Sequence, residues 1–434
     1  MLLNRRQLRL MLPLGAALAL SLTGDLTMYA VLANQTAVLG ISLAVVGVLL
    51  GVNRLIRIPG NLLAGALNDR RGPGFGRRPL FLLGLFLGIL STLSYSFVRG
   101  FWPLLAARLL WGISWSLINV TGFTMVLDGS TPGDRGRMMG FYQMAFMLGL
   151  AISPLLGGTL TDAVGFRQAV RICAAVSSIG LALALFALPE TRSLPGETAV
   201  TSGTVLWHQR LKAWASAWCQ VPQSGLLGSI RWAVGLVDRR ILLAGYIYSV
   251  ALFVSSGVMM STIALYLGQR WGTNVSLNGV AIGVSSLAGM LLAMRAFAGM
   301  LAGPLAGAFS DRLRDRWPVI RVGILLGAAG FVTLALLLQV WAVPAGVALV
   351  ALSAGALATA LAALMGDLAK ADQKGRTIGG LATAGDIGST AGPFVAYALL
   401  AILDLRWIYL LCALALASSL LATVGQGKRA TNTQ

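Results

Sequence analysis

The amino-acid sequence contains an internal repeat, which constrains the fold more than any other feature. The stretch from Asp128 to Pro154 returns 239 positions later, from Asp367 to Pro393. A second echo, at an offset of 242, relates GALNDRRG to GAFSDRLR. Identities at one offset rarely arise by chance, so we predict two copies of one unit. The pairs at the first offset are Asp128 and Asp367, Gly136 and Gly375, Arg137 and Arg376, Gly140 and Gly379, Gly149 and Gly388, and Pro154 and Pro393.

The composition is that of a membrane protein. Of the 434 residues, 57% are hydrophobic and only 11% are charged, whereas the surface of a soluble globule needs more charge. Apolar runs of about 20 residues, which can cross about 30 Å of hydrocarbon as helices, recur along the chain. We predict an all-α polytopic membrane protein with twelve transmembrane helices in two pseudo-symmetric bundles of six. The predicted spans are 10–32, 41–67, 79–98, 102–127, 138–160, 168–188, 241–268, 277–309, 318–340, 345–366, 377–402 and 407–425.

The basic residues indicate the orientation of the chain. The formal net charge is +19, and 24 of the 33 Lys and Arg residues fall in segments that the predicted spans place on one side. Because basic residues favour the cytoplasmic side, both termini are predicted to be cytoplasmic. The same distribution argues against a nucleic-acid partner and favours a lipid bilayer, in the plasma or inner membrane of the cell.

The predicted domains are a first bundle over residues 1–188, a cytoplasmic linker over 189–240, a second bundle over 241–425 and a cytoplasmic tail over 426–434. The first apolar run imitates a signal peptide, but its removal would leave the first unit one helix short, so we expect an uncleaved span. In the linker, Trp207, Leu211, Trp214 and Trp218 lie on one helical face, which predicts an amphipathic helix. This helix would lie in the headgroup layer or pack against the ends of the spans.

The loop after the second predicted span carries the sequence GALNDRRGPGFGRR. It resembles the G-x-L-x-D-R-x-G signature of the major facilitator superfamily, in which two basic residues follow. An inserted stretch, from Pro73 to Gly76, moves Arg77 and Arg78 further along the chain. The resemblance implies a conformational latch for the outward-facing state, formed by Gly65, Asp69 and Arg70 and, in the second copy, by Gly307, Asp311 and Arg312.

The fifth predicted span carries GLAISPLLGG. This stretch resembles the G-x-x-x-G-P-x-x-G-G motif of the same superfamily, with Ser153 in place of the second glycine, and the resemblance implies antiport or efflux. Glycines at this spacing flatten one helix face, and Pro154 removes a backbone hydrogen bond and favours a bend. We interpret the motif as a packing seam between the halves, which either only packs or also flexes. Its residues are Gly149, Pro154, Gly157, Gly158, Gly388 and Pro393.

In the fourth predicted span, RLLWG resembles the R-x-x-Q-G pattern of the superfamily, with Trp111 replacing glutamine. The resemblance implies that Arg108 tunes a nearby acid and, over the whole chain, that the protein is a secondary transporter with alternating access. An enzyme is not expected, because the predicted spans contain no histidine, no glutamate and no cluster of metal ligands. No cofactor or metal is predicted, and a proton gradient is the expected energy source.

Only two of the 14 acidic residues fall inside predicted spans, Asp25 and Asp386. A carboxylate at depth costs at least about 2.5 kcal/mol, so it is rarely kept without a partner, an aqueous cavity or a task. Asp25 shares its predicted level with Arg54 and Arg108, which predicts either a proton-releasing switch or a permanent ion pair. Asp386 lies near the predicted midplane, with Arg295 as the interior base of its half. It is predicted to carry a proton, to anchor substrate or to serve only the structure.

Polar and adaptable side chains in the spans are candidates for lining a substrate cavity, although such residues are more often ordinary packing residues. The expected function is proton-coupled export of a small amphipathic molecule by a protein that works as a monomer. The alternatives are uptake or uniport of a polar metabolite, flipping of a lipid, and a non-transporting receptor or scaffold. The candidate lining residues are Tyr29, Asn119, Gln143, Tyr246, Tyr248, Met259 and Met260.

Overall fold

The computed structural model describes residues 5–69, 76–131, 134–191, 239–277, 280–313, 315–337, 339–368 and 374–423. The predicted amphipathic helix from Trp207 to Trp218, most of the predicted linker and the predicted tail over 426–434 lie outside these residues. The described chain is almost entirely helical, as its long apolar runs predict, and contains one short β-hairpin.

The first half contains six helical spans, of which the first two are interrupted. The break between α4 and α5 falls at Ile56, where Pro59 cannot donate a backbone hydrogen bond to the preceding turn. The elements are α1 (Arg5–Ser21), α2 (Thr23–Val31), η1 (Leu32–Asn34), α3 (Thr36–Leu39), η2 (Leu43–Val45), α4 (Val46–Leu55), α5 (Arg57–Asp69), α6 (Arg77–Ser94), α7 (Phe101–Asp128), α8 (Arg135–Val164) and α9 (Phe166–Ala187).

The second half begins with a span that contains a π-helical segment, η3, between two α-helices. The eighth span, predicted from residue 277, begins only at Val284, because residues 274–277 and 280–283 pair as two antiparallel strands. The elements are α12 (Arg239–Leu252), η3 (Phe253–Met259), α13 (Met260–Trp271), β1 (Asn274–Leu277), β2 (Val280–Gly283), α14 (Val284–Leu313), α15 (Trp317–Leu336), α16 (Ala342–Leu368), α17 (Lys374–Leu399) and α18 (Leu405–Ala422).

The helices form a membrane protein of two bundles. Eleven of the described segments are long and apolar enough to cross a membrane. α17, with 26 residues, is a further long helix. The predicted all-helical fold with two six-helix bundles is therefore confirmed.

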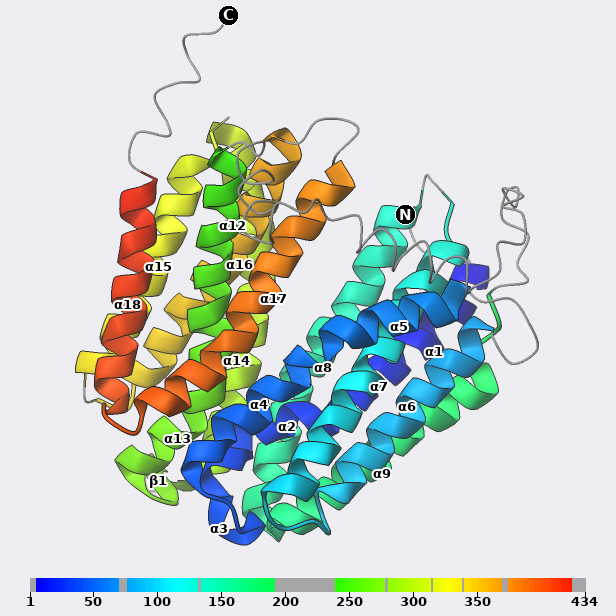
Figure 1. Cartoon of the computed structure of the whole chain (residues 1–434), viewed down its shortest axis with the longest axis horizontal. Coiled ribbons are helices and arrows are strands. Elements are labelled where there is room, and N and C mark those ends of the chain that lie inside the picture. Colours follow the sequence, from blue (N-terminus) through cyan, green and yellow to red (C-terminus); the bar gives the residue numbers. More distant parts are fainter. Residues whose placement is uncertain are drawn as a thin grey trace, which may run out of the picture.

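The two bundles meet along two seams, α8 against α14 and α4 against α17. They converge toward the end of the molecule that carries α3 and the β-hairpin, which we call the closed end (Figure 1). They spread apart toward the other end, where α1 begins and α18 ends, which we call the open end.

Glycines let the backbones of the two halves touch at both seams. A Cβ atom on Gly158 of α8 would lie 2.1 Å from the carbonyl oxygen of Ser285 at the start of α14. At the other seam, a Cβ atom on Gly47 of α4 would lie 2.5 Å from the carbonyl oxygen of Pro393 in α17. No larger residue fits without displacing one half, so small residues set the distance between the bundles.

The remaining glycines of the fifth-span motif and its copy pack inside their own halves. Gly149 lies against Ala19 of α1, and Gly157 lies against Thr27 of α2. Gly388 lies against the backbone of Ser249 in α12. The motif therefore faces two ways, with one side toward its own bundle and the other toward the opposite half.

A carboxylate joins the halves at the closed end. Asp162, near the end of α8, accepts a hydrogen bond of 2.6 Å from the backbone N–H of Ser286 in the first turn of α14. The N-terminus of a helix has unpaired N–H groups and a partial positive charge, so a carboxylate is favourable there. Because this contact crosses the bundle interface, it must break if the halves separate at the closed end.

Candidate functional site

A cavity of about 880 Å³ lies between the two bundles. Both halves contribute to its lining, through α2, α4, α5, α7 and α8 on one side and α12, η3, α13, α14, α16 and α17 on the other. Its volume is within the range of about 300–1,000 Å³ that is usual for small-molecule sites. Five charged residues line it, and these are Asp25, Arg54, Arg57, Arg295 and Asp386.

Asp25 is held in a buried network on the first-half wall of the cavity. Its side chain is 2% exposed and forms an ion pair with Arg108, which is fully buried. Asn53 donates a hydrogen bond of 2.8 Å to the same carboxylate oxygen, and Arg57 lies 3.9 Å from the other oxygen. Arg108 also donates to the carbonyl oxygen of Leu49, at 2.9 Å. The network holds these charges in place across four helices, α2, α4, α5 and α7.

Asn53 and Arg57 were not anticipated from the sequence. They lie four residues apart across the break between α4 and α5, and Arg57 donates to the Asn53 side chain at 3.1 Å. The guanidinium of Arg57 also lies 5.3 Å from the ring centroid of Trp115. A polar pair at i and i+4 within an apolar span is the signal that would have indicated them.

Arg54 connects the two halves instead of pairing with Asp25. It donates to the backbone carbonyl of Ser389 in α17 at 3.0 Å and contacts the sulfur of Met260 in α13 at 3.7 Å. Two guanidiniums lie near the ring of Tyr29, with Arg54 at 5.5 Å and Arg108 at 5.7 Å from its centroid. Arg54 and Arg108 therefore lie at a similar level along their helices, as expected. Arg54 is nevertheless directed toward the second half.

Asp386 and Arg295 are the charged groups of the second half in the cavity. Asp386 is exposed, and within the described residues its carboxylate forms no hydrogen bond or ion pair. It lies within electrostatic reach of Arg54 and Arg57. Arg295 donates to the hydroxyl of Ser256 at 2.8 Å and does not pair with Asp386. Met147, which corresponds to Asp386 at the offset of 239, lines the same cavity from the first half.

The candidate lining residues divide into two groups. Tyr29, Asn119, Gln143, Tyr248 and Met260 line the cavity. Tyr246 and Met259 do not, contrary to expectation. The hydroxyl of Tyr246 lies 3.3 Å from that of Ser418 in α18. Residues two positions apart on an α-helix point roughly 200° apart, so Tyr246 points away from the cavity that Tyr248 faces. Met259 ends the π-helical segment and is fully buried.

Ion pairs lie at the open end, beside the predicted latch residues. Arg77 binds Asp128 at 3.1 Å, and its backbone N–H donates to Glu190 at 3.0 Å. At an offset of 239, Arg316 binds Asp367 at 3.1 Å and also binds Asp311. The hydrogen bonds with Asp311 and Asp367 raise the pKa of Arg316 above its usual value.

The other latch residues take no part in these ion pairs. The Asp69 side chain and Arg70 lie outside the described residues. A Cβ atom on Gly65 would meet no atom within 4 Å, and one on Gly307 would meet only Thr359, at 3.5 Å. Arg312 is exposed.

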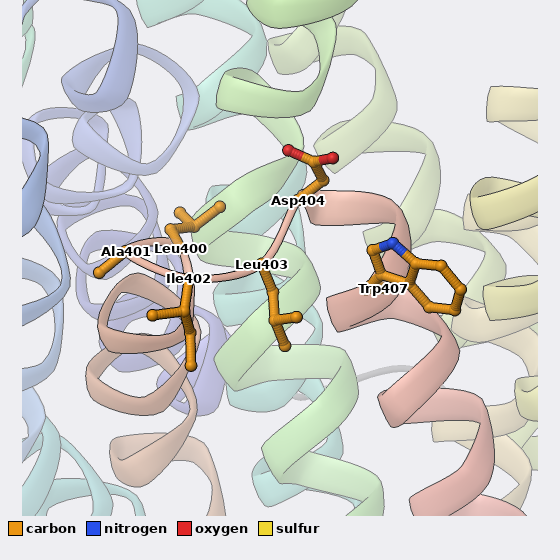
Figure 2. A pocket seen from close by; sticks show the side chains of 6 residues that line it. All are labelled: Leu400, Ala401, Ile402, Leu403, Asp404 and Trp407. Carbon is orange, nitrogen blue, oxygen red and sulfur yellow. The ribbon is translucent and has the colours of Figure 1, made fainter.

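A second hollow, of about 390 Å³, lies at the turn between α17 and α18 (Figure 2). It is lined by Leu400, Ala401, Ile402, Leu403, Asp404 and Trp407. Asp404 is the only charged residue among these six. A lining made from one turn brings few polar groups together, so the central cavity is the candidate site.

The family follows from the sequence of the whole chain. A family model described as Major Facilitator Superfamily matches residues 14–296 and 283–430. The chain belongs to the major facilitator superfamily. It is therefore a multi-pass membrane protein of a transporter family, not of an enzyme family.

Curated relatives of this major facilitator include a drug-resistance protein. The tetracycline resistance protein, class B, of Escherichia coli is 25% identical over 351 residues, which cover 80% of this chain and 77% of that protein. Protein spinster homolog 3 of Danio rerio is 32% identical over 128 residues, which cover 29% of this chain and only 25% of that protein.

Solved structures share the fold of this major facilitator. A bacterial homolog to the human lysosomal transporter Spinster, inward-facing and unoccupied, has a TM-score of 0.66 at 16% identity and covers 97% of this chain and 94% of that chain. The peptide transporter POT in complex with sulfate has a TM-score of 0.72 at 15% identity, with coverage of 96% and 94%.

Proposed function

We propose that this major facilitator exports a small amphipathic molecule by alternating access, coupled to the movement of protons. The observation that carries the proposal is the central cavity, which both halves line and which lies between two seams of close backbone contact. Similarity to a tetracycline resistance protein over 80% of the chain supports export. The site of action is the plasma or inner membrane, with both termini in the cytoplasm and the linker over residues 189–240 between domains 1–188 and 241–425.

Alternating access requires that the halves can rock about the cavity. The bundles spread at the open end and are joined at the closed end by Asp162, through its hydrogen bond with Ser286. With the termini in the cytoplasm, this arrangement is the inward-facing state. The outward-facing state then needs the Asp162 contact to break and the two halves to approach at the open end.

Asp386 is the better candidate for the coupling acid. Protonation of Asp25 would leave the buried Arg108 without its counter-ion, which is costly in a membrane interior. Asp386 is exposed in the cavity and makes no such pair, so it can gain or lose a proton without dismantling a network. Asp25 then positions Arg108 and Arg57, and Arg54, Arg108 and Arg295 modulate the charge around the site.

Proton movement in proteoliposomes tests this function. The purified protein is reconstituted with a pH-sensitive dye in the lumen, and amphipathic cations, neutral molecules and anions are added in turn. We expect at least one of them to trigger proton flux in the wild type and in Asp404→Asn, an exposed acid outside the cavity. The flux should be lost in Asp386→Asn.

Two other results would change the proposal. Loss of flux in Asp25→Asn, with Asp386→Asn still active, would move the coupling role to Asp25. Equilibration of a ligand without any proton movement would favour the uniporter alternative.

A further inference from the structure

The central cavity contains more positive than negative charge. Arg54, Arg57 and Arg295 line it, and Arg108 lies directly behind Asp25. The carboxylates of Asp25 and Asp386 are the only acidic groups in the lining. Four guanidiniums against two carboxylates leave an excess of two positive charges, even with Asp386 ionised. Such an excess is costly at membrane depth unless a ligand or water compensates it.

Two of the four arginines are available to a ligand. Asp25 accounts for Arg108 and lies beside Arg57. Arg54 contacts only neutral partners in the second half, a carbonyl oxygen and a methionine sulfur. Arg295 donates to one hydroxyl, and its Nε atom is buried without a hydrogen-bond partner in the described residues.

Arg54 and Arg295 come from opposite halves and share one space. Both guanidiniums line the same cavity, where the positive charge of each disfavours that of the other. An anion between them would relieve this repulsion and would supply acceptors for the unused donors, because guanidinium groups bind carboxylates and phosphates through paired N–H groups.

We propose that the cavity binds the anionic head group of an amphipathic organic anion, a carboxylate or phosphate, between Arg54 and Arg295. The inference rests on the proposed function only in that it takes the cavity as the substrate site. It does not depend on the direction of transport or on proton coupling. Binding across the two halves would also link the occupancy of the site to their relative position.

The rest of the lining suits the apolar part of such a molecule. Apolar side chains from both halves cover the cavity wall around the charged groups. An extended hydrocarbon or aromatic tail would bury its surface against them at about 25 cal/mol per Å². These side chains are Leu22, Leu26, Phe146, Leu150, Leu252 and Met300.

Binding of three pyrene probes with the same tail tests the charge preference. The probes are 1-pyrenebutyrate, 1-pyrenebutanol and pyrenebutyl-trimethylammonium, titrated onto the full chain in phosphatidylcholine nanodiscs with empty nanodiscs as the blank. We expect the carboxylate to bind roughly tenfold or more tightly than the alcohol, since a charge-assisted hydrogen bond has about this effect. The cation should bind most weakly.

Arginine variants test whether Arg295 causes the preference for the carboxylate probe. Arg295→Gln should reduce the carboxylate-to-alcohol ratio about tenfold, and Arg295→Lys should retain part of it. Arg99→Gln, an exposed arginine outside the cavity lining, should leave the ratio unchanged. The ratio compares two probes on one sample, so it is insensitive to a fraction of inactive protein.

Competition distinguishes two sources of the anion. Displacement of pyrenebutyrate by dihexanoyl-phosphatidylglycerol, and not by the matching phosphatidylcholine, would indicate an anionic lipid. Displacement by neither, with the preference intact, would indicate a soluble anion.

Equal binding of carboxylate and alcohol, tighter binding of the cation, or an unchanged ratio in Arg295→Gln would each overturn the proposal. The titrations use no proton gradient, so a failure of proton coupling would leave their result unaffected.

Discussion

The two halves of the molecule keep the same ion pair at the open end but differ in how they surround it. Arg77 with Asp128 corresponds, at the offset of 239, to Arg316 with Asp367. The first pair is 13% and 26% exposed, whereas Asp367 is 59% exposed. Glu190 also accepts a hydrogen bond from the backbone N–H of Arg77. The repeat therefore preserved the partners but not the depth of burial.

The halves differ more strongly in the membrane interior. The first half buries an ion pair between Asp25 and Arg108. The position of Arg108 corresponds to Val347, which is 1% exposed, and the described part of the second half contains no buried ion pair. Asp386 and Arg295 face the cavity separately. The first half thus holds its interior acid in a buried network, whereas the interior acid of the second half forms no ion pair in the described residues.

The largest expected effect separates the two interior acids. Asp25→Ala should lower the free energy of unfolding by about 3–5 kcal/mol, because it leaves Arg108 buried without a counter-ion. Asp386→Ala should change it by less than about 1 kcal/mol, since its carboxylate has no partner to lose. Unfolding in mixed micelles measures both. Equal losses in the two variants would remove the distinction between the halves.

The two seams between the bundles should both be destabilised when a glycine is replaced by alanine. Gly158→Ala and Gly47→Ala each place a Cβ atom within 2.1 and 2.5 Å, respectively, of a carbonyl oxygen in the opposite half. Each should destabilise the protein by about 1–3 kcal/mol. Gly140→Ala in α8 is the control, because its Cβ atom would meet nothing within 4 Å. The control should be neutral or slightly stabilising by helix propensity, up to about 1 kcal/mol. A loss of thermal stability in Gly140→Ala as large as that in the two seam variants would contradict this account.

The open-end ion pairs should differ in strength according to burial. Arg77→Gln should cost about 1.5–3 kcal/mol, because Arg77 binds a half-buried carboxylate. Arg316→Gln should cost only about 0.2–1 kcal/mol, as for exposed pairs. Raising the salt concentration should weaken the effect of Arg316→Gln more than that of Arg77→Gln. A greater effect of salt on Arg77→Gln would mean that burial does not determine the strength of the two ion pairs.

The smallest effect concerns the start of α8 in the first half. Asp134 accepts a hydrogen bond of 2.7 Å from the backbone N–H of Thr131, and this bond lowers the pKa of the carboxyl group. A lowered folded-state pKa stabilises the protein above the unfolded value of about 3.9 and loses that contribution as the pH falls through the folded pKa. The midpoint of thermal unfolding should therefore fall less in Asp134→Asn than in the wild type when the pH is lowered below about 4. Parallel curves would show that this group does not contribute.

Much of the fold could be predicted because membrane spans are local features. Apolar length and the repeat indicated two bundles of six helices, and the level of Asp25 along its helix suggested its proximity to Arg108. The strand pair formed by residues 274–277 and 280–283 was missed, since its short apolar stretch reads as the start of a helix. Asn53 and Arg57 were missed because their roles depend on a contact between helices.

The orientation of side chains within a span was harder to predict. Met259 and Met260 are adjacent, yet only Met260 lines the cavity, after a π-helical segment that changes the helical register. Arg54 was expected near Asp25 but is directed to Ser389. A helix turns by a fixed angle per residue, so one irregular segment redirects every later side chain.

The sequence by itself determined the class, the repeat, the number of spans and the two acids inside the membrane, because insertion into lipid depends on local hydrophobicity and charge. Only the tertiary structure decided that Asp25 is fixed in a buried network while Asp386 faces a cavity. It also placed Arg54 and Arg295, from opposite halves, in one space. Whether a buried charge is compensated depends on neighbours far away in the chain, and these become neighbours only when the two bundles pack together.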